Sequence, residues 1–459
     1  MSVLLRILDA KRSRLDAGLP QPDAVPALPS DGRRFERALR GGGTRVLAEI
    51  KHRSPSAGVL LPDAGRQVER QARAYRRGGA AALSVVTEQD FFGGDPFWIP
   101  RAKGASGLPV LMKDFVLDER QLDLALALGA DAVLLIAAAL DDEALRRLHG
   151  AALSRGLAAL VEAHTEEEAR RALAAGARIV GVNARDLATF SLDLERTARI
   201  GAGLPLDVLR VAESGLSRRA EVEGLSASFD AFLIGGTLLL SPDPARALRE
   251  LRGEGTTEVK VCGITRAEDL DPCAEAGVDY IGLNFSPRSP RRVTPRQADG
   301  LARAASFARG VVAVFAGNEP GEIREVAEAV RPDVLQLTDP PFDLRPSTFD
   351  SPVWQTVRVG RDDLSRAAAW PGAALLFDTA VGGLSGGTGA TFDWTLLDRL
   401  PRDRPWVLAG GLRPENVAGA VRAVRPDVVD VASGVESAPG VKDPARVNAF
   451  VREVRGAAN

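Results

Sequence analysis

The sequence of 459 residues contains little cysteine, histidine or net charge. Two cysteines cannot form a disulfide framework for so long a chain, which favours a reducing, cytoplasmic compartment. The three histidines lack the spacing of metal ligands, so we expect no metal site. The 59 basic and 61 acidic residues nearly cancel. This balance gives no electrostatic reason to expect nucleic acid or an anionic membrane as a partner.

Long apolar runs are also missing. The longest, 132–140, is far shorter than the roughly 18 residues that a membrane helix needs. Residues 1–14 mix basic and apolar side chains without a signal-peptide core. One hydrophobic core rarely organises 459 residues, so two domains of about 200–250 residues are expected.

Short apolar runs alternate with amphipathic helical stretches along the whole chain. Each run is continuous, as in a strand of a parallel sheet that is buried on both faces. Eight runs lie in the first half and eight in the second: 46–50, 82–86, 110–112, 132–136, 158–161, 179–182, 209–212 and 231–234, then 258–261, 280–283, 311–315, 334–337, 353–357, 374–377, 406–409 and 428–431. This pattern predicts an α/β fold of two tandem (β/α)8 TIM barrels.

A polar, glycine-rich stretch separates the two sets of runs. We expect residues 253–257 to link a domain of residues 1–252 to a domain of residues 258–459. The N-terminal 40 residues lie outside the repeat, with an amphipathic helix at 3–15 and a proline-rich loop at 20–29. This helix could plug the bottom of the first barrel or cover its mouth as a lid, and the sequence favours neither.

In a (β/α)8 barrel, the catalytic groups lie at the C-terminal ends of the strands. In the first half, polar or charged side chains follow five of the runs: Glu49 and Lys51, Lys113 and Asp114, Glu162, Asn183 and Arg185, Glu213 and Ser214. Opposite charges that meet at one mouth shift each other's pKa, which suits general acid–base chemistry. Any one of them could be an ordinary strand-end salt-bridge residue, but five such ends together favour a catalytic site.

Glycine turns follow the last two runs of both halves. They are Gly215 and Gly235-Gly236 in the first half, and Gly410-Gly411 and Ser433-Gly434 in the second. Backbone N–H groups in such turns bind anions, and barrels often bind phosphate at this place. We therefore predict one phosphate site in each half, although turns also use glycine for its backbone freedom.

The second half offers a different pair of reactive groups. Cys262 directly follows its first run and Asp378 directly follows its sixth. A thiol and a carboxyl that face each other can act as base and acid if positive charge or dipoles stabilise the thiolate. Cys273, within a helical pattern, is expected to be an inert core residue. The glycine-rich run 382–389, with Gly387 and Gly389, either wraps around a ligand or is a surface linker.

Ordered motifs make the first half resemble indole-3-glycerol phosphate synthase. These motifs are Glu49-Ile50-Lys51 with Ser54-Pro55-Ser56, Lys113-Asp114-Phe115, Val161-Glu162, Gly181-Val182-Asn183 with Arg185-Asp186-Leu187, and Glu213-Ser214-Gly215. The second half resembles phosphoribosylanthranilate isomerase. Its motifs are Lys260-Val261-Cys262-Gly263-Ile264-Thr265, Ser289-Pro290-Arg291, Phe377-Asp378, Gly386-Gly387-Thr388-Gly389 with Phe392-Asp393-Trp394, and Ser433-Gly434-Val435-Glu436. Together they resemble the bifunctional fusion of tryptophan biosynthesis.

For the second half, the resemblance implies an Amadori rearrangement of N-(5-phosphoribosyl)anthranilate to 1-(2-carboxyphenylamino)-1-deoxyribulose 5-phosphate. Asp378 would protonate the sugar ring oxygen, and Cys262 would take the proton from C2. Arg291 would hold an anionic group of the substrate, because a guanidinium stays charged and binds in a bidentate way. The small phosphorylated, anthranilate-derived substrates are the expected partners, and neither reaction requires a cofactor.

For the first half, the resemblance implies closure of the indole ring with loss of carbon dioxide and water. Lys113 would be the general acid and Glu162 the base, while Glu49 and Lys51 would assist proton transfer and hold the substrate carboxylate. The remaining motif residues would bind substrate, namely Ser54, Ser56, Asn183, Arg185, Glu213 and Ser214. A monomer is expected, because the fusion itself supplies a contact between barrels.

Three positions depart from the family patterns. Thr338-Asp339 follows Leu337, where the isomerase family usually has a histidine motif, and Ala184 and Met112 replace a common asparagine and arginine. The missing histidine supports an alternative in which only the synthase half is active and the C-terminal barrel is a non-catalytic partner domain. Another phosphosugar barrel, such as the histidine-pathway isomerase or cyclase, is less well supported, because those enzymes place aspartates at strands one and five.

Overall fold

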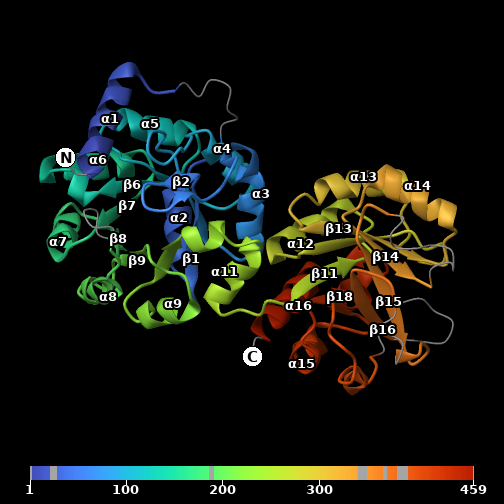
Figure 1. Ribbon diagram of the computed structural model, residues 1–459. Coiled ribbons are helices and arrows are strands. Elements are labelled where there is room, and N and C mark those ends of the chain that lie inside the picture. Colours follow the sequence, from blue (N-terminus) through green and yellow to red (C-terminus); the bar gives the residue numbers. More distant parts are fainter. Residues whose placement is uncertain are drawn as a thin grey trace. The chain divides into compact units, whose positions relative to one another are not determined.

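The computed structural model describes residues 3–20, 28–185, 191–339, 349–364, 370–379 and 391–457. The chain divides into two compact units, Met1–Gly253 and Glu254–Asn459. Each unit contains a closed barrel of eight parallel strands (Figure 1). The predicted fold of two tandem (β/α)8 barrels is therefore confirmed, and the division lies within the stretch 253–257.

The strands of the first barrel follow one another in chain order, and the ring closes where β1 pairs with β10. Their bounds are β1 Arg45–Ile50, β4 Ala82–Val86, β5 Val110–Lys113, β6 Ala132–Ile136, β7 Ala158–Ala163, β8 Ile179–Asn183, β9 Leu209–Glu213 and β10 Ala231–Ile234. A short hairpin of β2 (Arg53–Ser54) and β3 (Gly58–Val59) follows β1. Each predicted run of the first half coincides with one of these barrel strands.

The second barrel has the same order and closes where β11 pairs with β18. Its strands are β11 Glu258–Cys262, β12 Tyr280–Asn284, β13 Gly310–Ala316, β14 Val334–Thr338, β15 Val353–Val359, β16 Ala374–Thr379, β17 Trp406–Leu408 and β18 Val428–Val431. A hairpin of β19 (Glu436–Ala438) and β20 (Val441–Lys442) follows a short 3-10 helix, η6 (Ser433–Val435). The predicted strand at 406–409 ends one residue earlier than expected.

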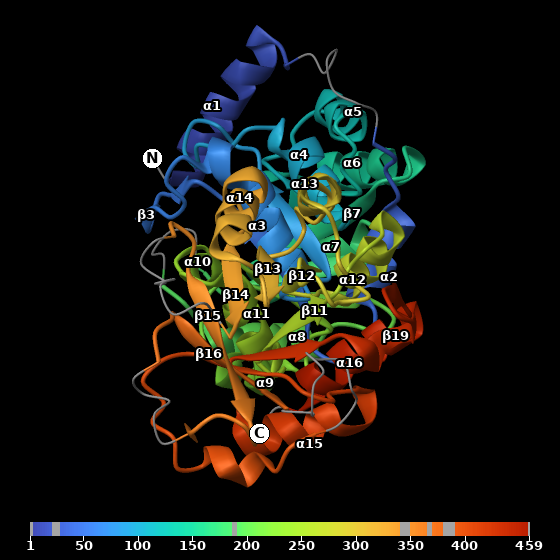
Figure 2. The ribbon, with the colours of Figure 1, turned by 90° about the vertical axis from the view of Figure 1, so that its right-hand side faces the viewer.

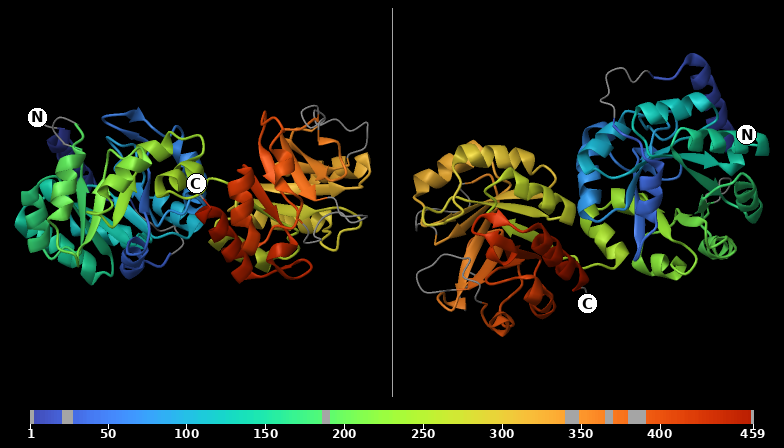
Figure 3. Two further views of the ribbon diagram at one scale, coloured as in Figure 1. Left: turned by 90° about the horizontal axis from the view of Figure 1, so that it is seen from below. Right: turned by 180° about the vertical axis from the view of Figure 1, so that it is seen from behind.

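Helices pack on the outside of each ring of strands, and in the second unit they follow β11, β12, β13, β17 and β20 (Figures 2 and 3). In the first unit they are α3 Ala64–Arg77, α4 Trp98–Ser106, α5 Glu119–Ala127, α6 Asp142–Ser154, α7 Glu166–Ala174, α8 Leu194–Ala202, α9 Arg219–Leu225, α10 Gly236–Leu239 and α11 Pro244–Arg252. In the second they are α12 Leu270–Ala276, α13 Pro295–Ala304, α14 Pro320–Val330, α15 Pro414–Val424 and α16 Pro444–Gly456. Across the described ranges, no helix has the length and apolar character needed to cross a membrane.

Two-sided burial of the strands explains the continuous apolar runs. In β1, Leu47 packs inside the ring, whereas its neighbours Val46 and Ala48 pack in the layer between strands and helices. Alternate side chains of a parallel barrel thus enter two different apolar layers, so that no position of the strand faces water. The barrel interior is a packed core up to the level of the catalytic end.

The segment before the first barrel contributes two helices, with different roles. The second, α2 (Gly32–Leu39), places Phe35 and Leu39 among the side chains that fill the barrel interior at the N-terminal ends of the strands. Its first residue, Gly32, approaches the backbone so closely that a Cβ atom would lie 2.4 Å from the Ala158 nitrogen. Helix α2 therefore closes the bottom of the barrel, a role that the sequence had suggested only for the helix before it.

We expect Phe35→Ala to lower the free energy of unfolding of the first unit by roughly 3–5 kcal/mol, because it opens a cavity in the core. Phe35 is fully buried, whereas Leu206 is 85% exposed, so Leu206→Ala serves as the matched control. Hydrogen exchange of β1–β10 peptides in urea reports on the first unit separately from the second. If Phe35→Ala costs no more than Leu206→Ala, helix α2 does not plug the barrel.

Candidate active sites

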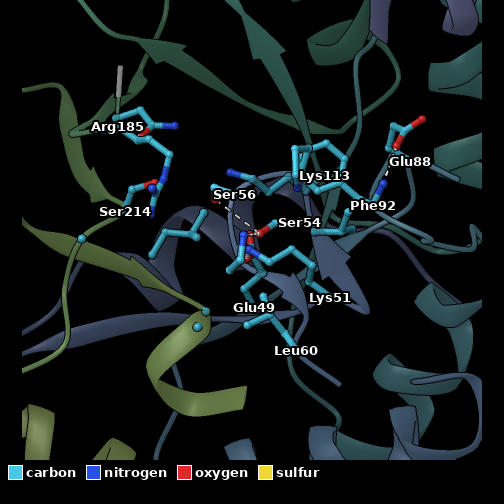
Figure 4. Close-up of a pocket in the computed structure, with 18 of the residues that line it drawn as sticks. Glu49, Lys51, Ser54, Ser56, Leu60, Glu88, Phe92, Lys113, Arg185 and Ser214 are labelled. Carbon is cyan, nitrogen blue, oxygen red and sulfur yellow. Dashed lines mark hydrogen bonds and ion pairs between the residues drawn. The ribbon is translucent and has the colours of Figure 1, made fainter. Parts of the chain in front are cut away.

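A cavity of about 490 Å³ opens at the C-terminal ends of the first barrel's strands. Most of the predicted site residues line it: Glu49, Lys51, Ser54, Ser56, Lys113, Glu162, Asn183, Arg185, Ser214, Gly215, Gly235 and Gly236. Figure 4 shows Lys51 and Lys113 reaching into the same space, with Arg185 and Ser214 on its other side. The strand-end residues of the sequence therefore meet in one place. Glu213 lies below the lining and is almost fully buried.

Lys113 lies between two carboxylates at the centre of this cavity. Its Nζ donates a hydrogen bond of 2.8 Å to Glu213 Oε2 and lies 3.5 Å from Glu162 Oε2. Burial alone would lower the pKa of Lys113, but the negative charges of Glu213, Glu162 and Glu49 outweigh it and raise the pKa. Lys113 is therefore a protonated ammonium at neutral pH, ready to donate a hydrogen bond or a proton.

The two buried carboxylates differ in their protonation. Burial raises the pKa of Glu213 to about 7, and the neighbouring Glu162 charge adds to this rise. For Glu162, burial acts in the same direction, but the charges of Lys113 and His164 outweigh it and lower the pKa. When two carboxylates are in contact, the one with the lower pKa ionises first, so Glu162 is the ionised member of the pair near neutral pH.

A second ion pair occupies the β1 side of the cavity. Lys51 donates a hydrogen bond to Glu49, and the charges of Lys51 and Lys113 outweigh burial to lower the pKa of Glu49. A Cβ atom on Gly235 would lie 2.4 Å from Glu49 Oε1. Only glycine at this turn leaves room for the buried carboxylate beside it, which explains one of the two predicted glycines of the turn.

Helix α1 (Val3–Ala17) borders the mouth of the first barrel, because its residues Val3, Leu4 and Ile7 line the cavity. The helix is attached there by a buried ion pair, in which Lys11 Nζ lies 2.6 Å from Asp114 Oδ1. Of the two positions that the sequence left open for this helix, the structure shows the one at the mouth.

Several neighbours of this site were not predicted from the apolar runs and motifs of the sequence. Phe92 and Phe115 give the cavity an apolar wall. His164 was considered only as a metal ligand, yet it lies behind Glu162, with Nε2 at 3.5 Å from Glu162 Oε1 and Nδ1 at 3.2 Å from Glu168 Oε2. His164 follows the same strand as Glu162, so the strand-end rule could have included it. Among the described residues, no cluster of three or more His, Cys, Asp or Glu side chains could hold a metal ion.

A second cavity of about 110 Å³ lies at the same end of the second barrel. The predicted residues that line it are Cys262, Arg291, Asp378, Gly410, Gly411 and Ser433. Gly434 packs instead against the loop after β17, where a Cβ atom would lie 2.0 Å from the Leu412 oxygen. Gly387 and Gly389 lie outside the described residues. The thiol and the carboxyl that were predicted to cooperate therefore face one cavity.

A buried lysine lies beneath Cys262. Lys260 is fully buried, and its Nζ donates hydrogen bonds to Asp430 Oδ2 (2.6 Å) and Gln336 Oε1 (2.9 Å). Burial raises the pKa of the Cys262 thiol, and the positive charge of Lys260 opposes this rise. Cys262 is therefore a thiol at rest, and it needs the lysine charge when it becomes a thiolate.

Asp378 has an environment that suits a proton donor. Burial raises its pKa to about 6, although a hydrogen bond of 2.8 Å from the backbone N–H of Thr379 opposes the rise. A carboxyl with this pKa keeps a measurable protonated fraction near neutral pH, unlike an ordinary aspartate. Asp378, which was predicted to be an acid, therefore has the electrostatic surroundings that suit a proton donor.

Arg291 faces the cavity but already binds a carboxylate of the chain. Its Nε and Nη2 donate to the two oxygens of Glu436 at 2.8 and 2.6 Å, and Lys442 Nζ lies 2.7 Å from the same carboxylate. The sequence did not anticipate this bidentate pair. An anionic substrate group would approach a guanidinium that already binds Glu436, and the substrate-binding role of Arg291 stays a prediction.

Consecutive backbone positions with positive φ form the predicted anion-binding turns. In the first barrel they are Ser214 (φ 69°) and Gly215 (φ 76°), and in the second they are Gly410 (φ 85°) and Gly411 (φ 62°). All four residues line their cavities. Glycine suits three of these positions because it adopts the left-handed region without strain, whereas the same backbone conformation is strained for Ser214.

Each barrel thus combines acid–base groups with glycine turns after its last strands, as enzymes that act on small phosphorylated substrates do. The chain matches the family model of indole-3-glycerol phosphate synthase over residues 5–251. It matches that of N-(5'phosphoribosyl)anthranilate (PRA) isomerase over residues 259–453. It therefore belongs to the family of bifunctional tryptophan-biosynthesis enzymes in which a synthase barrel precedes an isomerase barrel.

The chain is also similar to several individual proteins. The chain is 37% identical to the tryptophan biosynthesis protein TrpCF of Yersinia pestis, over 92% of this chain and 87% of that protein. It is 44% identical to the indole-3-glycerol phosphate synthase of Micrococcus luteus, over 56% of this chain and 99% of that one. The crystal structure of phosphoribosyl anthranilate isomerase from Thermotoga maritima is 36% identical, covers 43% of this chain and 98% of its own, and has a TM-score of 0.39.

The two cysteines should differ in reactivity. Cys262 faces the second cavity, whereas Cys273 is fully buried and burial raises its pKa to about 12. We expect iodoacetamide to modify Cys262 first, at a rate that keeps rising above the ordinary thiol pKa of about 8.5, because the thiol of Cys262 also has a raised pKa. Mass spectrometry of the intact protein measures this rate, and Cys262→Ser is the control. A rate that is already level at pH 7 would contradict a protonated thiol.

Proposed function

We propose that Asp378 and Cys262 are the acid and the base of the isomerase. Asp378 protonates the ring oxygen of N-(5-phosphoribosyl)anthranilate, and the bond between C1 and this oxygen breaks to give an iminium. Cys262, as thiolate, then takes the proton from C2, which leaves an enol that becomes the ketone. The observation that supports these roles is that both groups face one cavity, with a raised carboxyl pKa and a lysine beneath the sulfur.

In the synthase barrel, we assign the general acid to Lys113. Its ammonium donates to the ketone oxygen while the ring carbon that carries the carboxylate attacks the ketone carbon. Carbon dioxide leaves from that ring carbon, and the hydroxyl formed from the ketone oxygen takes a second proton from the reprotonated Lys113 and leaves as water. Glu162, which is the ionised carboxylate beside Lys113, accepts the proton that is lost when the indole forms.

The remaining assignments complete the synthase site. The Glu49–Lys51 pair assists proton transfer and presents an ammonium to the substrate carboxylate. Asn183 and Glu213 orient the sugar hydroxyls, while Ser54, Ser56, Arg185 and Ser214 bind the substrate. Except for Glu213, which lies below the lining, their common position around one cavity supports this group of roles. The turns at Gly215, Gly235 and Gly236, and those at Gly410, Gly411 and Ser433, would hold the phosphate of each substrate through backbone N–H groups.

We further propose that residues 1–252 and 258–459 are the two catalytic domains, with 253–257 as their linker. A cytoplasmic monomer stays a prediction of the sequence. The alternative of a non-catalytic C-terminal barrel is less well supported, because its acid, its base and its glycine turn are all present around one cavity.

Two reciprocal variants test the division of labour. We expect Lys113→Ala to reduce kcat of ring closure by at least about a hundredfold, as loss of a general acid does, and to leave isomerisation unchanged. Cys262→Ser should reduce isomerisation and leave ring closure unchanged. Each full-length variant is assayed with N-(5-phosphoribosyl)anthranilate and with the carboxyphenylamino-deoxyribulose phosphate, so each serves as the folding control of the other. Loss of both activities in a folded Lys113→Ala protein would refute the assignment.

The isomerase should also have an unusual pH dependence. Asp378 acts protonated and Cys262 acts ionised, yet the pKa of Asp378, about 6, lies below the raised pKa of Cys262. Between the two values, the active combination is a small but constant fraction of the molecules. Thus kcat/KM should rise with pH up to about 6, stay level, and fall only above the thiol pKa. A steady decrease from pH 6 upwards would contradict the role of Cys262 as base.

A further inference from the structure

The first barrel contains a buried histidine that the proposed mechanism does not use. His164 directly follows β7, two residues after Glu162, and only 6% of it is exposed. It is not among the residues that line the cavity. His164 therefore does not reach the substrate, and any effect that it has on the reaction must act through its neighbours.

A carboxylate of helix α7 fixes the orientation of the imidazole ring. Glu168 Oε2 lies 3.2 Å from Nδ1 of His164, and the same oxygen accepts the backbone N–H of His164 at 2.7 Å. Burial raises the pKa of Glu168, but the hydrogen bonds from His164 outweigh it and lower the pKa, so the carboxylate is ionised. Because an ionised carboxylate only accepts hydrogen bonds, Nδ1 carries a proton.

The other ring nitrogen faces the proposed base. Nε2 of His164 lies 3.5 Å from Glu162 Oε1, and this buried nitrogen has no hydrogen-bond partner among the described residues. Glu162 is ionised near neutral pH, so a neutral ring would direct the lone pair of Nε2 at a negative oxygen. A proton on Nε2 makes the contact attractive, and a small movement of the ring turns it into a charge-assisted hydrogen bond. The geometry therefore favours an imidazolium between two carboxylates.

The charged groups around His164 favour the same protonation state. Burial would lower the pKa of His164, but three carboxylates outweigh it and raise the pKa, namely those of Glu168 on α7, Glu162 on β7 and Glu213 on β9. Two cations lie beyond these carboxylates: Lys113 on β5 contacts Glu162, and Arg171 on α7 acts on Glu168. A histidine with a raised pKa keeps its charge into the neutral range.

Lys113 by itself does not explain why Glu162 is the ionised carboxylate. Its Nζ lies 2.8 Å from Glu213 but 3.5 Å from Glu162, so the shorter contact would favour a charge on Glu213. For Glu162, burial opposes ionisation, and the charges of Lys113 and then of His164 outweigh it and lower the pKa. Because Lys113 acts on both carboxylates, His164 is a cation that favours Glu162 over Glu213.

We propose that protonated His164 is a positioning residue of the synthase, which directs its Nε2–H at Glu162 and makes Glu162, rather than Glu213, the carboxylate that accepts the proton of the forming indole. This inference rests on the proposed role of Glu162 as base. His164 keeps both of its ring protons during the reaction, so its charge is still present when Lys113 gives up a proton. Glu168 keeps the ring in place throughout.

The charge of His164 can be measured directly, because the chain has only three histidines. NMR of the full-length protein with isotope-labelled histidine follows their titration, and His164→Gln and His149→Gln identify two of the signals by their loss. His164 should titrate above the ordinary histidine pKa of about 6.5. His149 is the comparison, because it is similarly buried and because burial and the charge of Arg178 lower its pKa. A His164 signal that titrates at or below the ordinary value would overturn the proposal.

The pH profile of ring closure tests the effect on Glu162. In His164→Gln, the limb of kcat/KM that rises as Glu162 ionises should move up by about one pH unit or more, as expected when a nearby opposite charge is removed. Above this limb, kcat/KM should approach that of the unaltered protein, because Glu162 is then ionised without the histidine. Glu168→Gln should shift the limb in the same direction by less, since it removes one of the carboxylates that keep His164 charged. His149→Gln should leave the limb in place.

An unchanged limb in His164→Gln, or an equal loss of kcat/KM at every pH, would show a merely structural role and would overturn the proposal. Glu162→Gln separates this failure from that of the proposed function. If the limb persists in Glu162→Gln, then Glu162 is not the base, whatever the charge of His164. If the limb disappears in Glu162→Gln but does not move in His164→Gln, only the role of His164 is refuted.

Discussion

A lysine held by carboxylates from other strands determines the electrostatics of both barrels. Lys113 lies between Glu213 and Glu162, and Lys260 binds Asp430. A charge in a barrel interior is costly unless it is paired and hydrogen-bonded, so each lysine fixes the protonation of the groups around it. The charge of Lys113 lowers the pKa of Glu162 and keeps it ionised, and the charge of Lys260 opposes the rise that burial causes in the pKa of Cys262. The acid–base chemistry of each mouth is thus set by its lysine.

The two barrels use this lysine differently. In the first, the ammonium of Lys113 faces the cavity and can itself meet the substrate. In the second, Lys260 is fully buried below Cys262, so its charge acts only through its neighbours. The acid that we propose for that barrel is the carboxyl of Asp378, and burial raises its pKa to about 6. One fold therefore accommodates the proposed lysine acid and the proposed aspartate acid, each lining the cavity of its own barrel.

Most of the fold and much of the sites could be predicted from the sequence, because a parallel barrel strand is apolar on both faces and its catalytic residue directly follows. That rule found Lys113, Cys262 and Asp378. It missed Asp430, because this charged residue lies inside the run 428–431 rather than directly after it. Arg358 also directly follows a run, 353–357, but only the structure shows that it lines the cavity. The plug α2 was missed because a short helix has too few residues to show which face is buried.

The raised pKa of Lys113 poses a problem for a general acid, because a group that holds its proton more tightly donates it less readily. Three carboxylates cause the rise, and Glu213 contributes the most among them. Glu213 has a pKa of about 7, so near neutral pH a large fraction of molecules carries it uncharged. In those molecules the strongest attraction that holds the proton on Lys113 is removed, while Glu162 stays ionised as a base. The titration of Glu213 therefore makes Lys113 a better donor at the pH where its partner is still a carboxylate.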